Sequence, residues 1–212
     1  AWAVRCYVVK YLGADEETCA FFKSAIGRLR VSNLGLSDKN QAAMAQFDDQ
    51  RVVEAYVALP LRLWDKALNA RKNAPSSRKS KEAQLMIQTA VAIEILIFAP
   101  IRIGNLQHLR LDEHITWQGK RMHIHIPKGQ VKNDQNLNFL LPESASKRIK
   151  TYIMEWRRLF TDMANPYLFP GRKMNPKDDT SLWRQIQKTI WNETGHQTHP
   201  SSVPACGSQD TA

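Results

Sequence analysis

Few cysteines and no long apolar run occur in this sequence of 212 residues. The three cysteines, Cys6, Cys19 and Cys206, are odd in number and far apart, which excludes the disulfide framework of a small secreted protein. The longest apolar run, 90–101, contains Glu94 and is too short to span a bilayer. The first residues lack the basic start and the cleavage site of a signal peptide. We therefore expect a cytoplasmic protein without a membrane partner. Because the sequence does not begin with methionine, we also expect a piece of a longer protein.

Motifs for metal or nucleotide chemistry are also missing. The sequence has no glycine-rich phosphate loop and no G-x-S-x-G nucleophile turn. His123 and His125 lie two apart, and His196 and His199 lie three apart, but no cysteine or carboxylate at metal spacing completes either pair. We predict no metal and no cofactor, and we interpret His123 and His125 as the polar face of a strand.

Positive charge is abundant. Thirty lysines and arginines against twenty acidic residues give a net charge of +10, which favours nucleic acid as the partner. An anionic membrane is the alternative, but no segment combines a basic face with a strong apolar moment. Residues 70–84, "ARKNAPSSRKSKEAQ", are typical of a mobile basic loop around Pro75. That loop is either a solvated linker or an arm that contacts phosphates.

Helical periodicity dominates the first half of the chain. It predicts helices over 1–46, 50–69 and 82–98, the second kinked or split by Pro60. The third is the most hydrophobic, and Pro100 ends it because proline disfavours helix at the residue before it. A short helix is expected to begin near Ile101 or Arg102.

A change of period marks the second half. Residues 114–142 alternate between apolar and polar side chains and turn at Gly119 and near Asn133, which predicts a three-stranded antiparallel sheet. Helical patterns follow, with Ser144 and Thr180 as expected N-caps, and "NPYLFPGRK" between them reads as a buried extended link. The predicted fold class is α+β, mostly α-helical, with one small sheet.

Arg102 is the only cation in a long apolar stretch. At a corner between two buried helices, its guanidinium could bind a phosphate through two oxygens, and Lys132 in the second sheet connection could supply a proton or a charge. Together they suit a phosphodiester on which negative charge develops. The alternative is structural: Arg102 forms an ion pair with Glu94 or Asp112, and Lys132 is merely exposed.

Three stretches resemble the tyrosine recombinases, the phage integrase family. "APIRIGNLQHLRLDEHITW" resembles the family's first arginine box, "IHIPKGQVKNDQNLNFLLP" the β-hairpin with the catalytic lysine, and "NPYLFPGR" the link before the next helix. The resemblance spans 48–200 and implies the recombinase catalytic-domain fold. Members cut double-stranded DNA with a tyrosine, form a 3′-phosphotyrosine and assemble as homo-tetramers on DNA, without metal or nucleotide. Two arginines and a histidine stabilise the phosphate, and a lysine protonates the leaving oxygen.

The resemblance assigns roles by position. Arg102 matches the first arginine and Lys132 the lysine, with Lys128 as the rival for the second role. Residues 1–47 resemble the end of the helical core-binding domain that clamps DNA from the other side, and 48–200 the catalytic domain. We expect further DNA contacts from the basic side chains Lys128, Arg78, Lys79, Lys81, Arg121 and Arg172.

The family pattern breaks after Pro200. The expected His-x-x-Arg-His box and the later tyrosine are missing, and no tyrosine follows Tyr167. Synonymous codons for 201–212, read one base forward, can spell His-Gln-Phe-Arg-His. We therefore interpret 201–212 as an aberrant tail produced by a frameshift and expect a recombinase domain of a bacterial mobile element that cannot cleave DNA. Two alternatives stay open: a DNA-binding accessory or regulatory protein, and a helical interaction module that needs its charge only for solubility.

Overall fold

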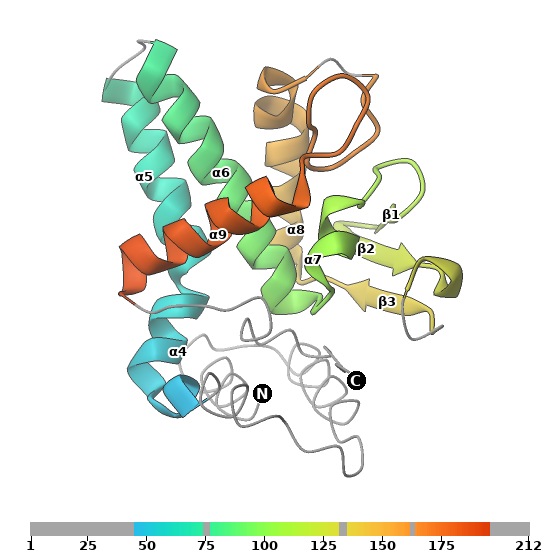
Figure 1. The fold of residues 1–212 in the computed structure, drawn as a ribbon, viewed down its shortest axis with the longest axis horizontal. Helices are drawn as coiled ribbons and strands as arrows, with labels where there is room; N and C mark the ends of the chain where they lie inside the picture. Colours follow the sequence, from blue (N-terminus) through green and yellow to red (C-terminus); the bar gives the residue numbers. More distant parts are fainter. Residues whose placement is uncertain (1–44, 74–76, 132–134, 162–163, 196–212) are drawn as a thin grey trace.

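The computed structural model describes residues 45–73, 77–131, 135–161 and 164–195. The predicted helix over 1–46 and the tail 201–212 lie almost entirely outside these ranges. Helices come first, a small sheet follows, and helices close the described part of the chain (Figure 1). The predicted fold class, mostly helical with a three-stranded antiparallel sheet, is confirmed.

Two helices lie where the sequence predicts one helix over 50–69 that Pro60 kinks or splits. A short 3-10 turn η1 (Gln46–Asp48) leads into α4 (Gln50–Val57), and α5 (Leu59–Asn73) follows after one residue. The split beside Pro60 was predicted: proline is tolerated in the first turn of a helix, where no amide partner is required. Helix α5 then continues four residues past the expected end.

The mobile basic loop predicted for 70–84 is wrong over most of its length. Helix α5 runs to Asn73, α6 begins at Ser77, and only 74–76 fall outside the described residues. Lysine and arginine are good helix formers, and tertiary packing extends both helices. The Arg71 guanidinium lies 4.8 Å from the centre of the Trp156 ring, and Ala83 is fully buried.

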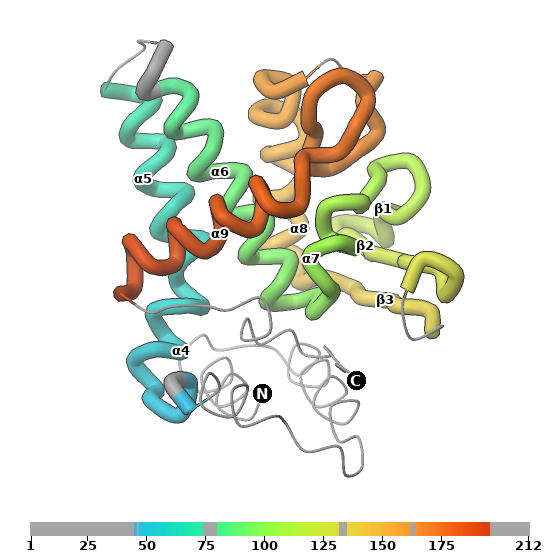
Figure 2. Tube along the Cα trace, viewed as in Figure 1, coloured from blue at the N-terminus to red at the C-terminus, as the bar shows by residue number. Residues whose placement is uncertain are grey.

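Helix α6 (Ser77–Phe98) forms the centre of the core. Its second half buries apolar residues around its whole circumference, which explains why the sequence shows a continuous apolar run there. The helix ends at Phe98, two residues before Pro100, as predicted. Helix α5 packs along α6, and α9 (Asp179–Thr194) crosses over it (Figures 1 and 2).

The sheet has the predicted order and direction. Strands β1 (Ile115–Gln118) and β2 (Arg121–Ile126) form a hairpin, and β3 (Leu137–Leu140) pairs with the other edge of β2. Gly119 has φ +60°, a left-handed conformation that favours glycine in such a tight turn. Alternate residues of β2 are buried, which places Met122, Ile124 and Ile126 toward the helices.

The helices after the sheet begin at other residues than predicted. Helix α8 (Glu143–Thr151) has Pro142 rather than Ser144 at its N-cap, since Glu143 already occupies the first turn, where acidic side chains are favourable. Helix α9 has Asp178 rather than Thr180 at its N-cap: the carboxylate accepts a hydrogen bond from the Ser181 amide at 2.8 Å. Hydrogen bonding from the Ser181 side chain and, second, from its backbone amide lowers the pKa of Asp178.

Between α8 and α9 the chain covers one end of the core. A π-helical turn η3 (Tyr152–Trp156) and a 3-10 turn η4 (Arg157–Leu159) continue α8. The predicted buried link, 165–173, buries Leu168 and Phe169 completely, whereas Arg172 and Lys173 at its end are exposed. Within the described ranges, no helix is long and apolar enough to cross a membrane.

Candidate functional site

Arg102 occupies the corner that the sequence predicted. It is the N-cap of α7 (Ile103–Gln107), with extended backbone angles of φ −64° and ψ 151°. Its carbonyl accepts a hydrogen bond from the Leu106 amide at 2.9 Å. The buried side chains of Ile101 and Leu106 anchor both sides of the corner, and Arg102 itself is half-buried. Packing on both sides therefore fixes the backbone position from which the Arg102 side chain extends.

The two carboxylates considered as structural partners of Arg102 each bind another arginine. Arg148 on α8 donates to Glu94 on α6, with Nε at 2.9 Å from Oε1. Arg110 binds Asp112 through two hydrogen bonds of 3.0 and 2.7 Å. Burial raises the pKa of Glu94 despite the opposing effect of Arg148, whereas the hydrogen bond from Arg110 lowers the pKa of Asp112. Glu94 and Asp112 therefore each have an arginine partner of their own.

The sheet connection carries the two rival lysines. Lys132 falls in 132–134, outside the described residues, so its convergence with Arg102 stays a prediction. Lys128 is exposed and opens the 3-10 turn η2 (Lys128–Gln130), one residue after the end of β2. Its backbone amide donates to the Asn136 side chain at 2.8 Å, which ties the two ends of the connection together.

The loop after α7 is organised by Arg110. Besides Asp112, Arg110 lies 3.3 Å from Glu113 and its guanidinium carbon is 5.8 Å from the centre of the Tyr167 ring. The carboxylates raise the pKa of Arg110 further. Backbone bonds from Leu111 to Pro166 and from Leu168 to Leu109, 2.8 and 2.7 Å, fasten this loop to the extended link.

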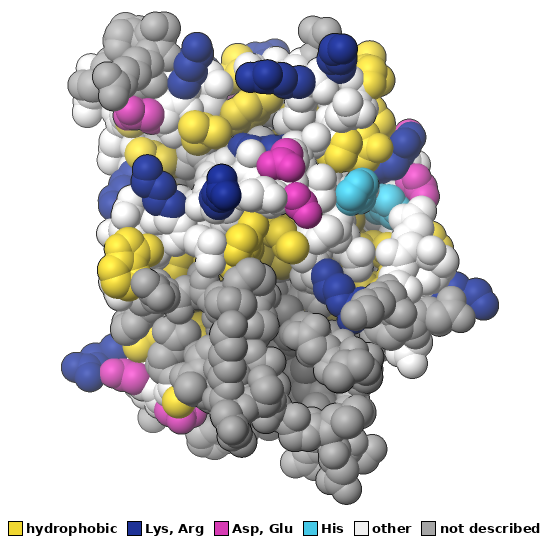
Figure 3. Space-filling model, in the orientation of Figure 1, with side chains coloured by type: hydrophobic (Ala, Val, Ile, Leu, Met, Phe, Trp, Pro, Cys, Tyr) yellow, Lys and Arg dark blue, Asp and Glu magenta, His cyan; other side chains and the backbone are white. Residues whose placement is uncertain are grey.

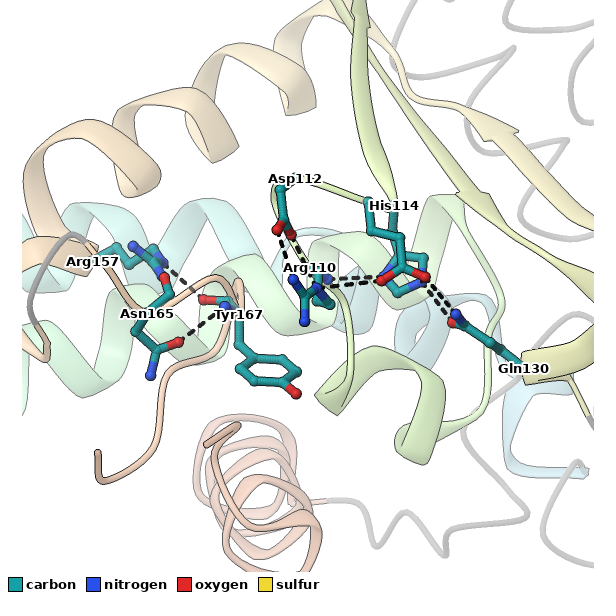
Figure 4. Close-up of polar contacts among 8 residues, drawn as sticks. Arg110, Asp112, His114, Gln130, Arg157, Asn165 and Tyr167 are labelled. Atoms are coloured by element: carbon teal, nitrogen blue, oxygen red, sulfur yellow. Dashed lines mark hydrogen bonds and ion pairs between the residues drawn. The ribbon is translucent and has the colours of Figure 1, made fainter. Parts of the chain in front are cut away.

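His114 and Gln130 join this loop to the sheet connection. The buried His114 ring accepts a bond from the Arg110 amide at Nδ1, 3.0 Å away. Since that nitrogen is an acceptor, Nε2 carries the proton and donates to Gln130 Oε1 at 2.7 Å. Gln130 in turn donates from Nε2 to Glu113 at 2.5 Å. Figure 4 shows this series of side chains, with Arg110 between Asp112 and His114.

A cavity of about 530 Å³ opens beside these groups. The ring of Tyr167 packs edge-on against His108, with ring centres 6.3 Å apart. Arg157 holds the backbone of this segment by donating from Nε to the Tyr167 carbonyl at 2.9 Å (Figure 4). The cavity walls combine α7, the arginine loop, the sheet and the link through Gly104, Asn105, His108, Arg110, Glu113, His114, Ile126, Gln130 and Tyr167.

The other cations expected to contact DNA are widely separated. Lys81 lies near the start of α6, which rises about 1.5 Å per residue, so roughly 25 Å of helix lies between it and the end of α6 near Arg102. Arg78 and Lys79 belong to the same distant first turns. Arg121, at the start of β2, donates from Nε to the Leu141 carbonyl at 3.1 Å, and Arg172 is exposed in the loop before α9.

The space-filling view agrees with this separation. Figure 3 shows lysine and arginine side chains scattered over one face, without a continuous basic patch among the coloured atoms. The described residues therefore do not gather all the predicted DNA contacts at Arg102. Arg121 lies at the start of β2 and Lys128 in the turn after it, whereas the cations at the start of α6 lie at the end of α6 that is far from Arg102.

The described residues contain no candidate metal site. No group of three or more histidine, cysteine or acidic side chains could hold an ion there. His125 pairs with Asn138 at 2.7 Å and His123 with Thr116 at 3.3 Å, both across strands. These two histidines form the polar face of β2, as the sequence indicated.

His114 and Gln130 were not singled out from the sequence. His114 is one residue before a strand and Gln130 is one polar residue among many in a loop, so neither carries a motif. Their significance depends on a hydrogen bond between residues sixteen positions apart. Alternation gives no signal for His114 either, because it places His114 on the same face of the strand as the exposed Thr116.

A sequence profile of the phage integrase family matches residues 68–202 of the chain. The chain belongs to the phage integrase family. The matched range includes the corner at Arg102, the whole sheet and the link to α9, which agrees with the three stretches on which the resemblance was based. No curated protein matches the chain.

The chain was also compared with solved structures, and three of the matches are recombinases. One is XerH site-specific recombinase bound to palindromic difH substrate in a post-cleavage complex. Its sequence is 21% identical to this chain, with a TM-score of 0.46, and the match covers 68% of this chain and 37% of XerH. The XerH pre-cleavage complex is 19% identical with the same TM-score, covering 68% and 39%. XerA recombinase is 16% identical with a TM-score of 0.39, covering 94% and 80%. The chain thus corresponds to well under half of the length of XerH.

Proposed function

We propose that residues 48–200 form the catalytic domain of a site-specific DNA recombinase and that residues 1–47 are the end of its core-binding domain. The observation that carries this proposal is the family match over 68–202 together with a half-buried arginine at the N-cap of α7. The net charge of +10 supports double-stranded DNA as the partner.

Arg102 is proposed to bind the phosphate at which the strand is cut. A guanidinium offers two parallel N–H groups to two non-bridging oxygens and stays charged at every physiological pH. It therefore stabilises the negative charge that builds on these oxygens when a fifth oxygen approaches the phosphorus. Packing at the corner reduces the entropy lost on placing this cation.

A lysine of the sheet connection is proposed to protonate the leaving 5′-oxygen. Lys132 is the favoured residue and Lys128 its rival. Lys128 starts from a turn fixed at both ends, and among the described residues no carboxylate pairs with its ammonium. In the family reaction a tyrosine oxygen bonds to phosphorus, the 5′-oxygen leaves, and the lysine proton moves to it.

The polypeptide of 212 residues is proposed to bind DNA without cutting it. Of the described tyrosines, Tyr56 and Tyr152 are buried, and burial raises the pKa of both hydroxyls. Tyr167 faces the cavity beside His108. None follows the helix α9 where the family nucleophile is expected. The frameshift interpretation of 201–212 is tested by reading the coding DNA after His199 in all frames.

The remaining proposals follow from the family alone. A recombinase of this kind works in the bacterial cytoplasm on the nucleoid, belongs to a mobile element and assembles as a homo-tetramer on its DNA site. The alternative is an accessory or regulatory protein that binds DNA and never cut it. Restoring the shifted reading frame separates the two, because only a recombinase gains cleavage.

Steep salt dependence of DNA affinity is expected for the wild-type polypeptide. Each neutralised phosphate contributes about −0.9 to the slope of log K against log[salt]. Titration of a labelled duplex at several salt concentrations measures this slope. A slope near zero would contradict DNA binding and favour the helical interaction module.

A further inference from the structure

A closed ring of three hydrogen bonds and one ion pair connects the arginine loop with the turn that carries Lys128. The Arg110 amide donates to His114, His114 donates to Gln130, and Gln130 donates to Glu113. Glu113 closes the ring through its contact with Arg110 at 3.3 Å. Figure 4 shows Gln130 at the far end of this series, reaching toward His114 from the sheet side.

The direction of each hydrogen bond in this ring is fixed by the atoms that form it. A backbone amide can only donate, so His114 Nδ1 must accept, and Nε2–H must then point at an acceptor. Gln130 satisfies this requirement with its carbonyl oxygen and uses its amide hydrogens on the Glu113 carboxylate. Alanine at position 130 could neither accept from the histidine nor donate to the carboxylate, and an ionised carboxylate there could not donate.

The turn η2 depends on this anchor. Gln130 itself is exposed, so its apolar contacts do not hold it. Backbone bonds within the turn, from Gln130 to Pro127 and from Val131 to Lys128, are short-range. Beyond the Asn136 contact at Lys128 and the buried Val131, the Gln130 side chain joins the turn to the arginine loop.

We propose that Gln130, held by the neutral His114, is a positioning residue that fixes the Lys128 turn relative to the arginine loop, so that the Lys128 ammonium is presented to a DNA phosphate. This role rests on the proposed function. It concerns the presentation of a cation and not the stability of the domain, because an exposed glutamine in a short turn contributes little to the core.

A double-mutant cycle of DNA affinity tests this positioning role. Lys128→Ala is expected to reduce the salt slope of the wild-type polypeptide by about 0.9, the value for one phosphate contact. In the Gln130→Ala background the same change is expected to reduce the slope by far less, because the lysine is already displaced. Thermal unfolding of Gln130→Ala provides the check that the domain remains folded.

A polarity exchange provides the rescue. Gln130→Glu alone places two carboxylates together and is expected to behave like Gln130→Ala. In the double variant Gln130→Glu with Glu113→Gln, the new carboxylate accepts from both His114 and the introduced amide. Lys128→Ala is then expected to reduce the salt slope by its full amount again. A purely structural role would not produce this recovery. The nitrogen chemical shifts of the His114 imidazole show whether the proton is on Nε2, as the closed series of hydrogen bonds requires.

The outcomes separate this inference from the function on which it rests. Equal slope changes for Lys128→Ala in all backgrounds, or none in any background while DNA binding persists, overturn the positioning role and leave the DNA-binding proposal intact. A wild-type polypeptide with no salt-dependent binding overturns the proposed function itself. A loss in Gln130→Ala that the exchange restores supports the inference.

Discussion

No covalent protein–DNA adduct is expected when the 212-residue polypeptide is incubated with a suicide substrate, a nicked duplex that traps the phosphotyrosine. Attack on phosphorus requires an accessible tyrosine oxygen. Of the tyrosines in the described part of the chain, Tyr152 is fully buried and donates its hydroxyl to the Leu168 carbonyl at 3.0 Å, Tyr56 is buried, and Tyr167 is half-buried. Denaturing gel electrophoresis measures the adduct.

The control for this prediction is binding of the same duplex under native conditions, which is expected to persist. An adduct band in wild type would contradict the account. If that band disappeared in Tyr167→Phe, it would identify the half-buried tyrosine of the cavity as the nucleophile.

Replacing Arg148 with alanine is expected to lower the free energy of unfolding by about 3 kcal/mol. Arg148 is the partner of Glu94, whose side chain is only 3% exposed, while the arginine side chain is 26% exposed. Removing the arginine leaves a buried carboxylate without its compensating charge. Urea unfolding measures the effect, and Arg158→Ala, at an exposed position nearby in sequence, is the matched control with a change near zero.

The Arg148→Ala deficit is expected to depend on pH. Burial raises the pKa of Glu94 above its ordinary value of 4.5, and Arg148 opposes that rise. Without Arg148 the native state keeps the Glu94 proton at pH values where the unfolded chain has lost it, so stability falls as pH rises above about 4.5. The deficit should therefore shrink toward pH 4. A deficit that is constant with pH, or absent at neutrality, would contradict this interpretation of the buried pair.

Local patterns predicted most of the fold. Pro60 and Pro100 mark real helix boundaries because proline restricts the backbone directly, and alternation over 114–142 identified a sheet with one buried face. The basic segment 70–84 was misread because charged residues suit helices as well as loops, and the contact of Arg71 with Trp156 is visible only in three dimensions. Asp178 replaced Thr180 as a cap since both types cap well and tertiary structure decides between them.

The site was predicted only in part. Arg102 stood out because a cation in an apolar stretch demands a reason, and its corner is where the pattern indicated. The resemblance favours Lys132 over Lys128, but the length of a sheet connection does not fix which of the two side chains points to the site. The Arg148–Glu94 pair and the His114–Gln130 bond join residues far apart in the chain, and a single sequence contains no signal for such contacts.

The central claim is that Arg102 binds a DNA phosphate, and the salt slope of Arg102→Ala tests it most directly. Removing one phosphate contact is expected to reduce the slope of log K against log[salt] by about 0.9, whereas Arg184→Ala, which removes the same charge from an exposed position on α9, is expected to leave it nearly unchanged. Equal slopes for wild type and Arg102→Ala, with the domain folded, would contradict the claim.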